Sequence, residues 1–278
     1  METRNRIWVG LGVVVAASAA FYVGTNSDSD MAGMDHSVMA GMDHSVMAGA
    51  EGGGKGGEEG GSTEDAIASD AVYLGQLAFI RGHLNVGVNL YREGLVEAAA
   101  THMKHPGDEL YADLLPAIEA RGAEDFADQL ETLALAVENQ QPLSDVEQAN
   151  TTLLEAIAAA ESVVTEQDAR TLGAVIVDLV RTAAAEFDIA TADDGALENE
   201  HEYQDSLGFV RIANDLLEVL AGKTDNADAV AAIRVQLETL LPIWPSLQAP
   251  QHLATEPSVI YGAASRIETA VLSLQDEI

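Results

Sequence analysis

The chain of 278 residues contains no cysteine, and it has only 13 lysines and arginines against 46 aspartates and glutamates. Without cysteine there are no disulfides, no thiolate metal sites and no cysteine nucleophile. The formal net charge of −33 excludes nucleic acid as a partner, because a phosphate-binding basic surface is missing. The hydrophobic content of 47% is nevertheless enough to build a folded core. The composition therefore permits a folded protein that attracts cations.

The first residues of the chain form one long uncharged run. Arg4 and Arg6 precede Ile7–Gly24, a stretch of 18 residues without a charge. As a helix it would span roughly 27 Å, about the thickness of a bilayer core. We therefore predict that residues 1–24 are a membrane anchor or a cleaved signal peptide with small residues at 17–19 as the cleavage site. In both cases the arginines stay in the cytoplasm, which predicts a periplasmic protein that is tethered to the inner membrane or released.

Residues 25–50 contain a tandem repeat in which MAGMDHSV occurs twice, followed by a third MAG. Five of the seven methionines and two of the seven histidines lie in this tail. A thioether is a soft ligand that prefers Cu(I), and imidazole suits both oxidation states of copper. The tail is therefore a candidate copper site with the ligands Met31, Met34, His36, Met39, Met42, His44 and Met47.

The stretch at residues 31–49, MAGMDHSVMAGMDHSVMAG, resembles the methionine- and histidine-rich repeats of bacterial periplasmic copper-resistance proteins. This resemblance implies that the seven tail residues collect copper, chiefly as Cu(I). It also implies an envelope protein that donates copper to this chain or accepts copper from it. Multicopper oxidases of that group need His-Cys-His motifs, which a chain without cysteine cannot contain. Oxidase activity is therefore not implied, and the rest of the chain shows no family resemblance that we recognise.

Residues 51–63 are rich in glycine and glutamate and contain no large apolar residue, which predicts a flexible linker. Residues 64–278 show apolar residues at helical spacing and no strand-like alternation. They predict an all-α antiparallel bundle of about eight helices with short connections. The expected helices are Asp70–Glu93, Pro106–Arg121, Glu124–Asn139, Ser144–Val164, Glu166–Ala190, Glu200–Ala221, Ala227–Leu241 and Pro257–Leu274. Ser144 and Thr165 are the expected N-caps of two of them.

A faint duplication runs through this domain. Leu-Gly pairs open two long helices at residues 74–75 and 172–173, and a histidine follows each pair about 28 residues later, at His102 and His201. The next helices end at Arg-Gly and Ala-Gly pairs, at residues 121–122 and 221–222. These matches predict a four-helix unit that occurs twice.

A first group of candidate ligands in the bundle is His102, His105 and Glu109, which would share one face of a continuous helix. Pro106 disfavours helical geometry at His105, so we expect the helix to break there. The two histidines would then lie at a helix junction, as part of a metal site or exposed to solvent.

A second group is Glu198, His201, Glu202 and Asp205, which the expected helix would place on one face. Glu198-x-x-His201 has the spacing of di-iron bundles, but those need the motif twice and it occurs once here. The alternative is a solvated acidic face. His83 is either a core-edge histidine or a ligand, and His83, His102 and His201 would converge if their helices were neighbours. Gly82 and Gly87 predict that other helices approach the His83 helix closely.

The sequence contains no phosphate-binding loop, no nucleophile elbow and no zinc-protease motif, so it favours a binding protein over an enzyme. Our main hypothesis is an exported protein that captures, buffers or hands on copper through the tail. The first alternative is an iron or copper metalloprotein of oxidase or storage type, with ligands among His83, His102, His105 and His201. The second alternative is a structural or interaction module of the envelope with an inert repeat.

Overall fold

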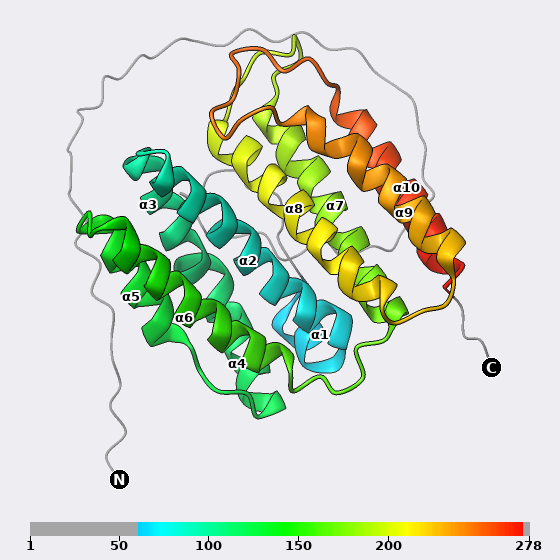
Figure 1. The fold of residues 1–278 in the computed structure, drawn as a ribbon, viewed down its shortest axis with the longest axis horizontal. Helices are drawn as coiled ribbons and strands as arrows, with labels where there is room; N and C mark the ends of the chain where they lie inside the picture. The colour runs from blue at the N-terminus through cyan, green and yellow to red at the C-terminus, as the bar shows by residue number, and fades with distance from the viewer. Residues whose placement is uncertain (1–60, 275–278) are drawn as a thin grey trace, which may run out of the picture. The chain divides into compact units, whose positions relative to one another are not determined.

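The computed structural model describes residues 61–274, which form ten α-helices and two short helical turns without a β-strand (Figure 1). The predicted all-α class is therefore confirmed. The helices are α1 (Thr63–Ala68), α2 (Asp70–Arg92), α3 (Val96–His105), α4 (Tyr111–Arg121), α5 (Ala127–Glu138), α6 (Leu143–Glu161), α7 (Ala169–Ala190), α8 (Glu200–Ala221), α9 (Ala227–Leu240) and α10 (Pro257–Leu272). None of these described helices is long and apolar enough to cross a membrane. The predicted N-terminal segment at residues 1–24 and the tail at 25–50 lie outside the described residues.

The predicted helix break at Pro106 is wrong. His105 has helical backbone angles, with φ −50° and ψ −51°, and the chain continues through the π-helical turn η1 (Pro106–Leu110) into α4. The backbone N–H of Tyr111 donates to the carbonyl of Pro106, five residues earlier. A proline at the start of this turn costs little, because the wider π-turn replaces the hydrogen bonds that a regular helix would need there. His102 and His105 therefore stay on one helical path.

Two predicted helix starts also differ from the structure. α6 begins at Leu143, directly after Pro142, so Ser144 lies inside the helix. α7 begins at Ala169, and its N-cap is Asp168 rather than Thr165. The Asp168 carboxylate accepts a hydrogen bond from the backbone N–H of Thr171 at 2.7 Å. An aspartate at this position also interacts favourably with the positive end of the helix dipole.

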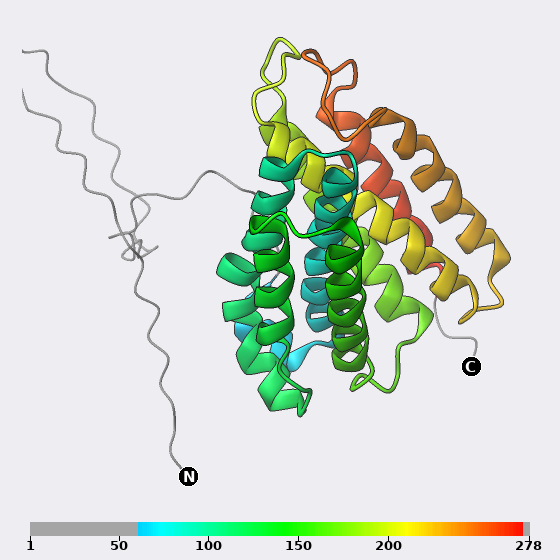
Figure 2. The same cartoon turned by 60° about the vertical axis from the view of Figure 1, so that its left-hand side comes forward.

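Eight of the ten described helices pack in two sets of four. In the first set α2 packs against α3 and α6, and α5 packs against the same two helices. In the second set α7 packs against α8 and α10, and α9 packs against these two. The sets meet where α2 contacts α7 and α8, which lie beside it in both views (Figures 1 and 2). In both sets each helix packs against the next one of its set along the chain, and the fourth helix packs back against the first.

Glycines allow the close helix contacts around α2. A Cβ on Gly208 of α8 would lie 2.6 Å from the carbonyl oxygen of Gly82 on α2. A Cβ on Gly87 would lie 2.6 Å from Cε of Met103 and 3.3 Å from Cβ of His102, both on α3. The predicted close approach at Gly82 and Gly87 is therefore confirmed. It brings α3 and α8 against α2 on either side of His83.

Candidate metal centre

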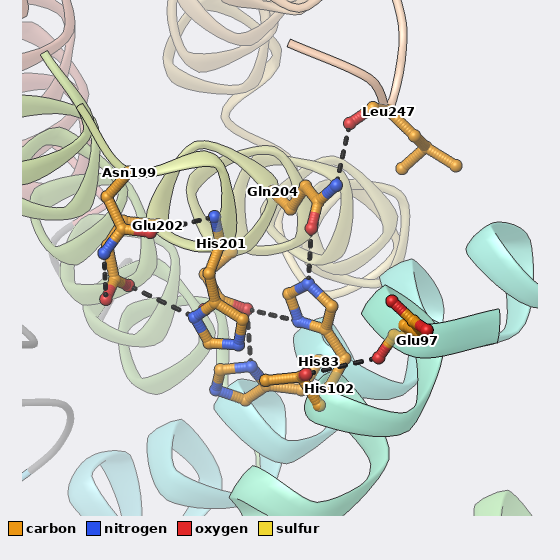
Figure 3. A network of polar contacts seen from close by, with 10 residues as sticks. His83, Glu97, His102, Asn199, His201, Glu202, Gln204 and Leu247 are labelled. Carbon is orange, nitrogen blue, oxygen red and sulfur yellow. Dashed lines mark hydrogen bonds and ion pairs between the residues drawn. The ribbon is translucent and has the colours of Figure 1, made fainter. Parts of the chain in front are cut away.

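Side chains from α2, α3 and α8 meet in the interior between the two helix sets (Figure 3). They are His83 on α2, His102 on α3, and His201 and Asp205 on α8. The side chains of His83, His102 and Asp205 are completely buried, and that of His201 is 22% exposed. The convergence of the three histidines, which the sequence left open, is thus present in the structure.

Two imidazole nitrogens surround one carboxylate oxygen of Asp205. Nδ1 of His83 lies 2.6 Å from Oδ1, and Nδ1 of His102 lies 3.0 Å from the same atom. Nδ1 of His102 and both oxygens of Asp205 nevertheless have no hydrogen-bond partner of good geometry. Ligand atoms about 2.1 Å from one metal ion are about 3.0 Å apart when they bind at right angles. The 3.0 Å contact of His102 has this spacing, whereas His83 at 2.6 Å would have to move slightly away from Asp205 to bind the same cation.

Gln204 determines which nitrogen of His102 carries the proton. The Gln204 side-chain amide donates to the backbone carbonyl of Leu247 at 3.0 Å, so its oxygen faces Nε2 of His102 at 2.8 Å. Because that oxygen can only accept, Nε2 of His102 must donate. Nδ1 of His102 faces the Asp205 carboxylate, so an ion bound between them would take the place of a proton on Nδ1 while Nε2 keeps its own proton. Imidazoles that bind metals are typically held in this way, with the other N–H donated to a protein oxygen.

A second group of donors lies on the other oxygen of Asp205. Nδ1 of His201 is 3.1 Å from Oδ2 of Asp205 and 3.7 Å from Oε2 of Glu202. One donor atom each from His201, Glu202 and Asp205 lie within 4.8 Å of one another, and the same holds for His83, His102 and Asp205. Asn199, the N-cap of α8, donates to Oε1 of Glu202 at 3.2 Å and so orients its carboxylate (Figure 3).

The charges of the cluster follow from its burial and its neighbours. Burial raises the pKa of Asp205, but His83 and His102 together lower it far below its usual range. Burial lowers the pKa of His201, yet Glu202 and Asp205 raise it above the ordinary value. The pKa of Glu202 is raised by burial and lowered more strongly by its neighbours, including a hydrogen bond with Glu186. Asp205 is thus an anion, the state in which a carboxylate binds a metal.

The other predicted ligands have different positions. The ring centroid of His105 lies 4.7 Å from that of His83 and 5.6 Å from that of His201, so this side chain borders the cluster. Glu109 lies in η1, and its side chain is outside the described part of the structure. Glu198 is exposed in the loop before α8, so it does not share the helical face of His201. The predicted tail ligands, from Met31 to Met47, lie outside the described residues.

Asp205 belonged to the second group that the sequence predicted, and it follows His201 at helical spacing as expected. Two other residues of the cluster, Glu186 and Gln204, were not predicted from the sequence. Glu186 is a completely buried carboxyl in an alanine-rich segment of α7, so its position in an apolar run was a usable signal. Nothing in the sequence around Gln204 indicated that it orients His102, because this role depends on its hydrogen bond to the backbone carbonyl of Leu247.

The fold and this donor set define an all-helical bundle with a candidate metal centre between its two halves. Residues 160–276 match the family model of the iron permease-associated 4-helix bundle domain. This match covers less than half of the chain, and it spans α7–α10, the second helix set. No curated protein and no solved structure matches the chain.

The match corrects the prediction that the helical domain has no recognisable family. It also points to iron rather than copper as the metal, because iron is the metal in the description of the matching domain. The apolar periodicity of α7–α10 could not show this relation, since many unrelated bundles share that pattern.

Proposed function

We propose that the helical domain binds iron as a cargo, with His83, His102 and Asp205 as ligands, and that the protein handles iron for a membrane permease. The observation that carries the proposal is the pair of buried Nδ1 atoms around one oxygen of Asp205. The description of the matching domain supports both the metal and the permease as partner.

The donor set fits iron chemically. Imidazole nitrogen suits Fe, Zn and Cu ions, and carboxylate oxygen is a hard donor that favours Fe over Cu(I). The methionine beside His102 is Met103, whose thioether packs against Gly87. The donors around Asp205 are therefore nitrogen and oxygen, which favours Fe(II) or Fe(III) over the soft Cu(I) ion.

The chain's own residues have separate tasks in this proposal. Asp205 supplies the negative charge that compensates the ion. His83 and His102 supply neutral nitrogen donors from the first helix set. Gln204 holds His102 in the tautomer whose Nδ1 is free to bind. Binding and release are exchanges of ligands and need no covalent chemistry.

We also propose that the domain lies outside the cytoplasm, anchored beside the permease or released. Support comes from Arg4 and Arg6, which precede the uncharged run Ile7–Gly24. In this location the domain would meet iron before a permease carries it through the inner membrane. The metal partner is then an envelope protein that takes iron from the domain.

The proposal is tested by anaerobic titration of the full chain with Fe(II) against a chromophoric chelator. Asp205→Asn is compared with Asp215→Asn, an exposed residue on the same helix with the same change of charge. We expect Asp205→Asn to lose Fe(II) that the unmodified chain and Asp215→Asn both bind. All three proteins contain the N-terminal tail, so any Fe(II) that the tail binds is the same in each and does not affect the comparison. Equal Fe(II) binding in all three would overturn the proposal, and loss of Cu(I) binding alone would overturn the assignment of iron.

A further inference from the structure

We propose that Asp205 bridges two metal ions, so that His201 and Glu202 form a second position beside the one formed by His83 and His102. This inference rests on the proposed function, and it adds a second ion to the same centre. The two donor groups, His83–His102–Asp205 and His201–Glu202–Asp205, have only Asp205 in common.

The two oxygens of Asp205 face different donors. Oδ1 lies 2.6 Å and 3.0 Å from the Nδ1 atoms of His83 and His102, whereas Oδ2 lies 3.1 Å from Nδ1 of His201. Asp205 is completely buried, and imidazole nitrogens of three histidines face its two oxygens. A buried anion is costly unless cations compensate it. Each oxygen therefore has the surroundings of a metal ligand.

The rings of His102 and His201 face different oxygens of Asp205. The rings of His102 and His201 are nearly parallel, with an interplanar angle of 14° and a centroid distance of 4.3 Å. Each ring directs Nδ1 to a different oxygen of Asp205. Ions in two-metal sites lie about 3.5–4 Å apart. The ring centroids are slightly farther apart than this, and each imidazole is placed to bind its own ion on one oxygen of Asp205.

The charge of the cluster also favours a second ion. The ion-pair partners of Asp205 and Glu202 in the described structure are histidines. Glu202 brings a second carboxylate into the cluster beside Asp205, and the completely buried Glu186 of α7 is hydrogen-bonded to Glu202. Each of the two positions therefore has a carboxylate within reach, Asp205 for the first and Glu202 for the second.

The two positions differ in their access to solvent. The side chains of His83 and His102 are completely buried, whereas those of His201 and Glu202 are 22% and 12% exposed. An ion at the second position can therefore exchange ligands with water or a chelator directly. The second position is therefore the more accessible of the two.

The test measures how many Fe(II) ions the full chain binds under anaerobic conditions. The number that Asp205→Asn binds is then subtracted. Two variants remove ligands of the second position, Glu202→Gln and His201→Ala. Glu218→Gln is the control, because Glu218 is exposed on the same helix and undergoes the same change of charge. We expect a difference of two ions for the unmodified chain and for Glu218→Gln, and of one ion for Glu202→Gln and His201→Ala.

Mn(II) gives an independent measurement, because two bridged Mn(II) ions show an exchange-coupled signal in electron paramagnetic resonance. We expect this signal in the unmodified chain, and the signal of an isolated ion in Glu202→Gln. A difference of one Fe(II), unchanged in both second-position variants, would overturn the second position and leave the proposed function intact. Identical Fe(II) binding by the unmodified chain and Asp205→Asn would overturn both.

Discussion

The two helix sets have the same order of neighbours, but they contribute different chemistry to the centre. The first set supplies imidazoles, from His83 and His102, whereas the second supplies the carboxylates of Glu202 and Asp205 together with His201. Only the second set lies within the match to the iron permease-associated 4-helix bundle domain. The second set alone therefore holds the donor group of His201, Glu202 and Asp205, whereas the group of His83, His102 and Asp205 needs both sets. The centre depends on the contact between α2 and α8, where the two sets join.

The predicted duplication indicates which residues of the two sets correspond to each other. It pairs His102 with His201, and in the structure these two rings stack at 4.3 Å. With the same spacing, the position that corresponds to Asp205 is Pro106, the first residue of the π-helical turn. The histidine is thus present in both sets, but the carboxylate is present in one. A shared origin of the two sets remains a prediction.

Removal of one imidazole from each set is the strongest test of this comparison. We expect His83→Asn to lower Fe(II) affinity about 100-fold and His201→Asn about 10-fold, within the range typical of changes around metal sites. The effect at His83 is larger because this side chain is fully buried, whereas water can replace the partly exposed His201. Chelator competition measures both affinities. Equal losses would show that the sets contribute equally.

The contact between the sets can be weakened without touching a ligand. Gly208→Ala places a Cβ 2.6 Å from the carbonyl oxygen of Gly82, so the two helices must move apart. We expect a loss of about 1–3 kcal/mol in the free energy of unfolding, with weaker Fe(II) binding. Urea unfolding and chelator competition measure the two effects.

Gly262→Ala on α10 is the matched control. Its Cβ would meet only the flexible side chain of Arg266, at 3.3 Å. A glycine inside a helix costs about 0.5–1 kcal/mol relative to alanine, so this change should be neutral or stabilising. If Gly208→Ala behaved in the same way, the α2–α8 contact would not require glycine.

The link between Gln204 and His102 tests whether one set positions a ligand of the other. Gln204→Leu removes the acceptor of the Nε2 proton, so His102 can adopt the other tautomer. We expect Fe(II) affinity to fall about 10-fold, and ¹⁵N NMR of His102 should show a mixture of tautomers. Gln204→Glu keeps an acceptor and should restore the tautomer. An unchanged tautomer in Gln204→Leu would contradict the positioning role.

The smallest effect concerns one buried tyrosine in each set. The hydroxyl of Tyr73 donates to the carbonyl of Ala160, and that of Tyr203 donates to the carbonyl of Ser246. Burial raises the pKa of both tyrosines to about 12. Because ionisation is easier in the unfolded chain, their contribution is complete below pH 10 and is lost as the pH rises from about 10 to 12.

Tyr73→Phe and Tyr203→Phe should each cost about 1 kcal/mol at neutral pH through the lost hydrogen bond. At pH 11 both variants should lose less stability than the unmodified chain does. Urea unfolding at pH 8 and pH 11 measures this. If a variant had the same pH dependence as the unmodified chain, burial would not raise the pKa of the replaced tyrosine in the folded protein.

Prediction from the sequence succeeded where a local pattern decides the structure. The predicted bounds of α8 agree with the structure at both ends, where Asn199 caps the first turn and Gly222 follows the last. α3 was missed because Leu95 precedes it without a side-chain cap, and because the π-helical turn hides its continuity with α4. Short or irregular helices are stabilised mainly by packing, which is not visible in local sequence.

The sequence by itself determined the all-α class, the course of α2 and α8, and the placement of His201 and Asp205 on one helical face. It also determined the close approach at Gly82, because a glycine in a helix removes the side chain that would keep a neighbour away. Only the tertiary structure decided that His83 and His102 meet Asp205, and that Leu247 holds Gln204 against His102. These contacts join residues up to 122 positions apart on different helices. Helical periodicity defines which face of each helix is buried, but the partner of that face is selected by the packing of the whole bundle.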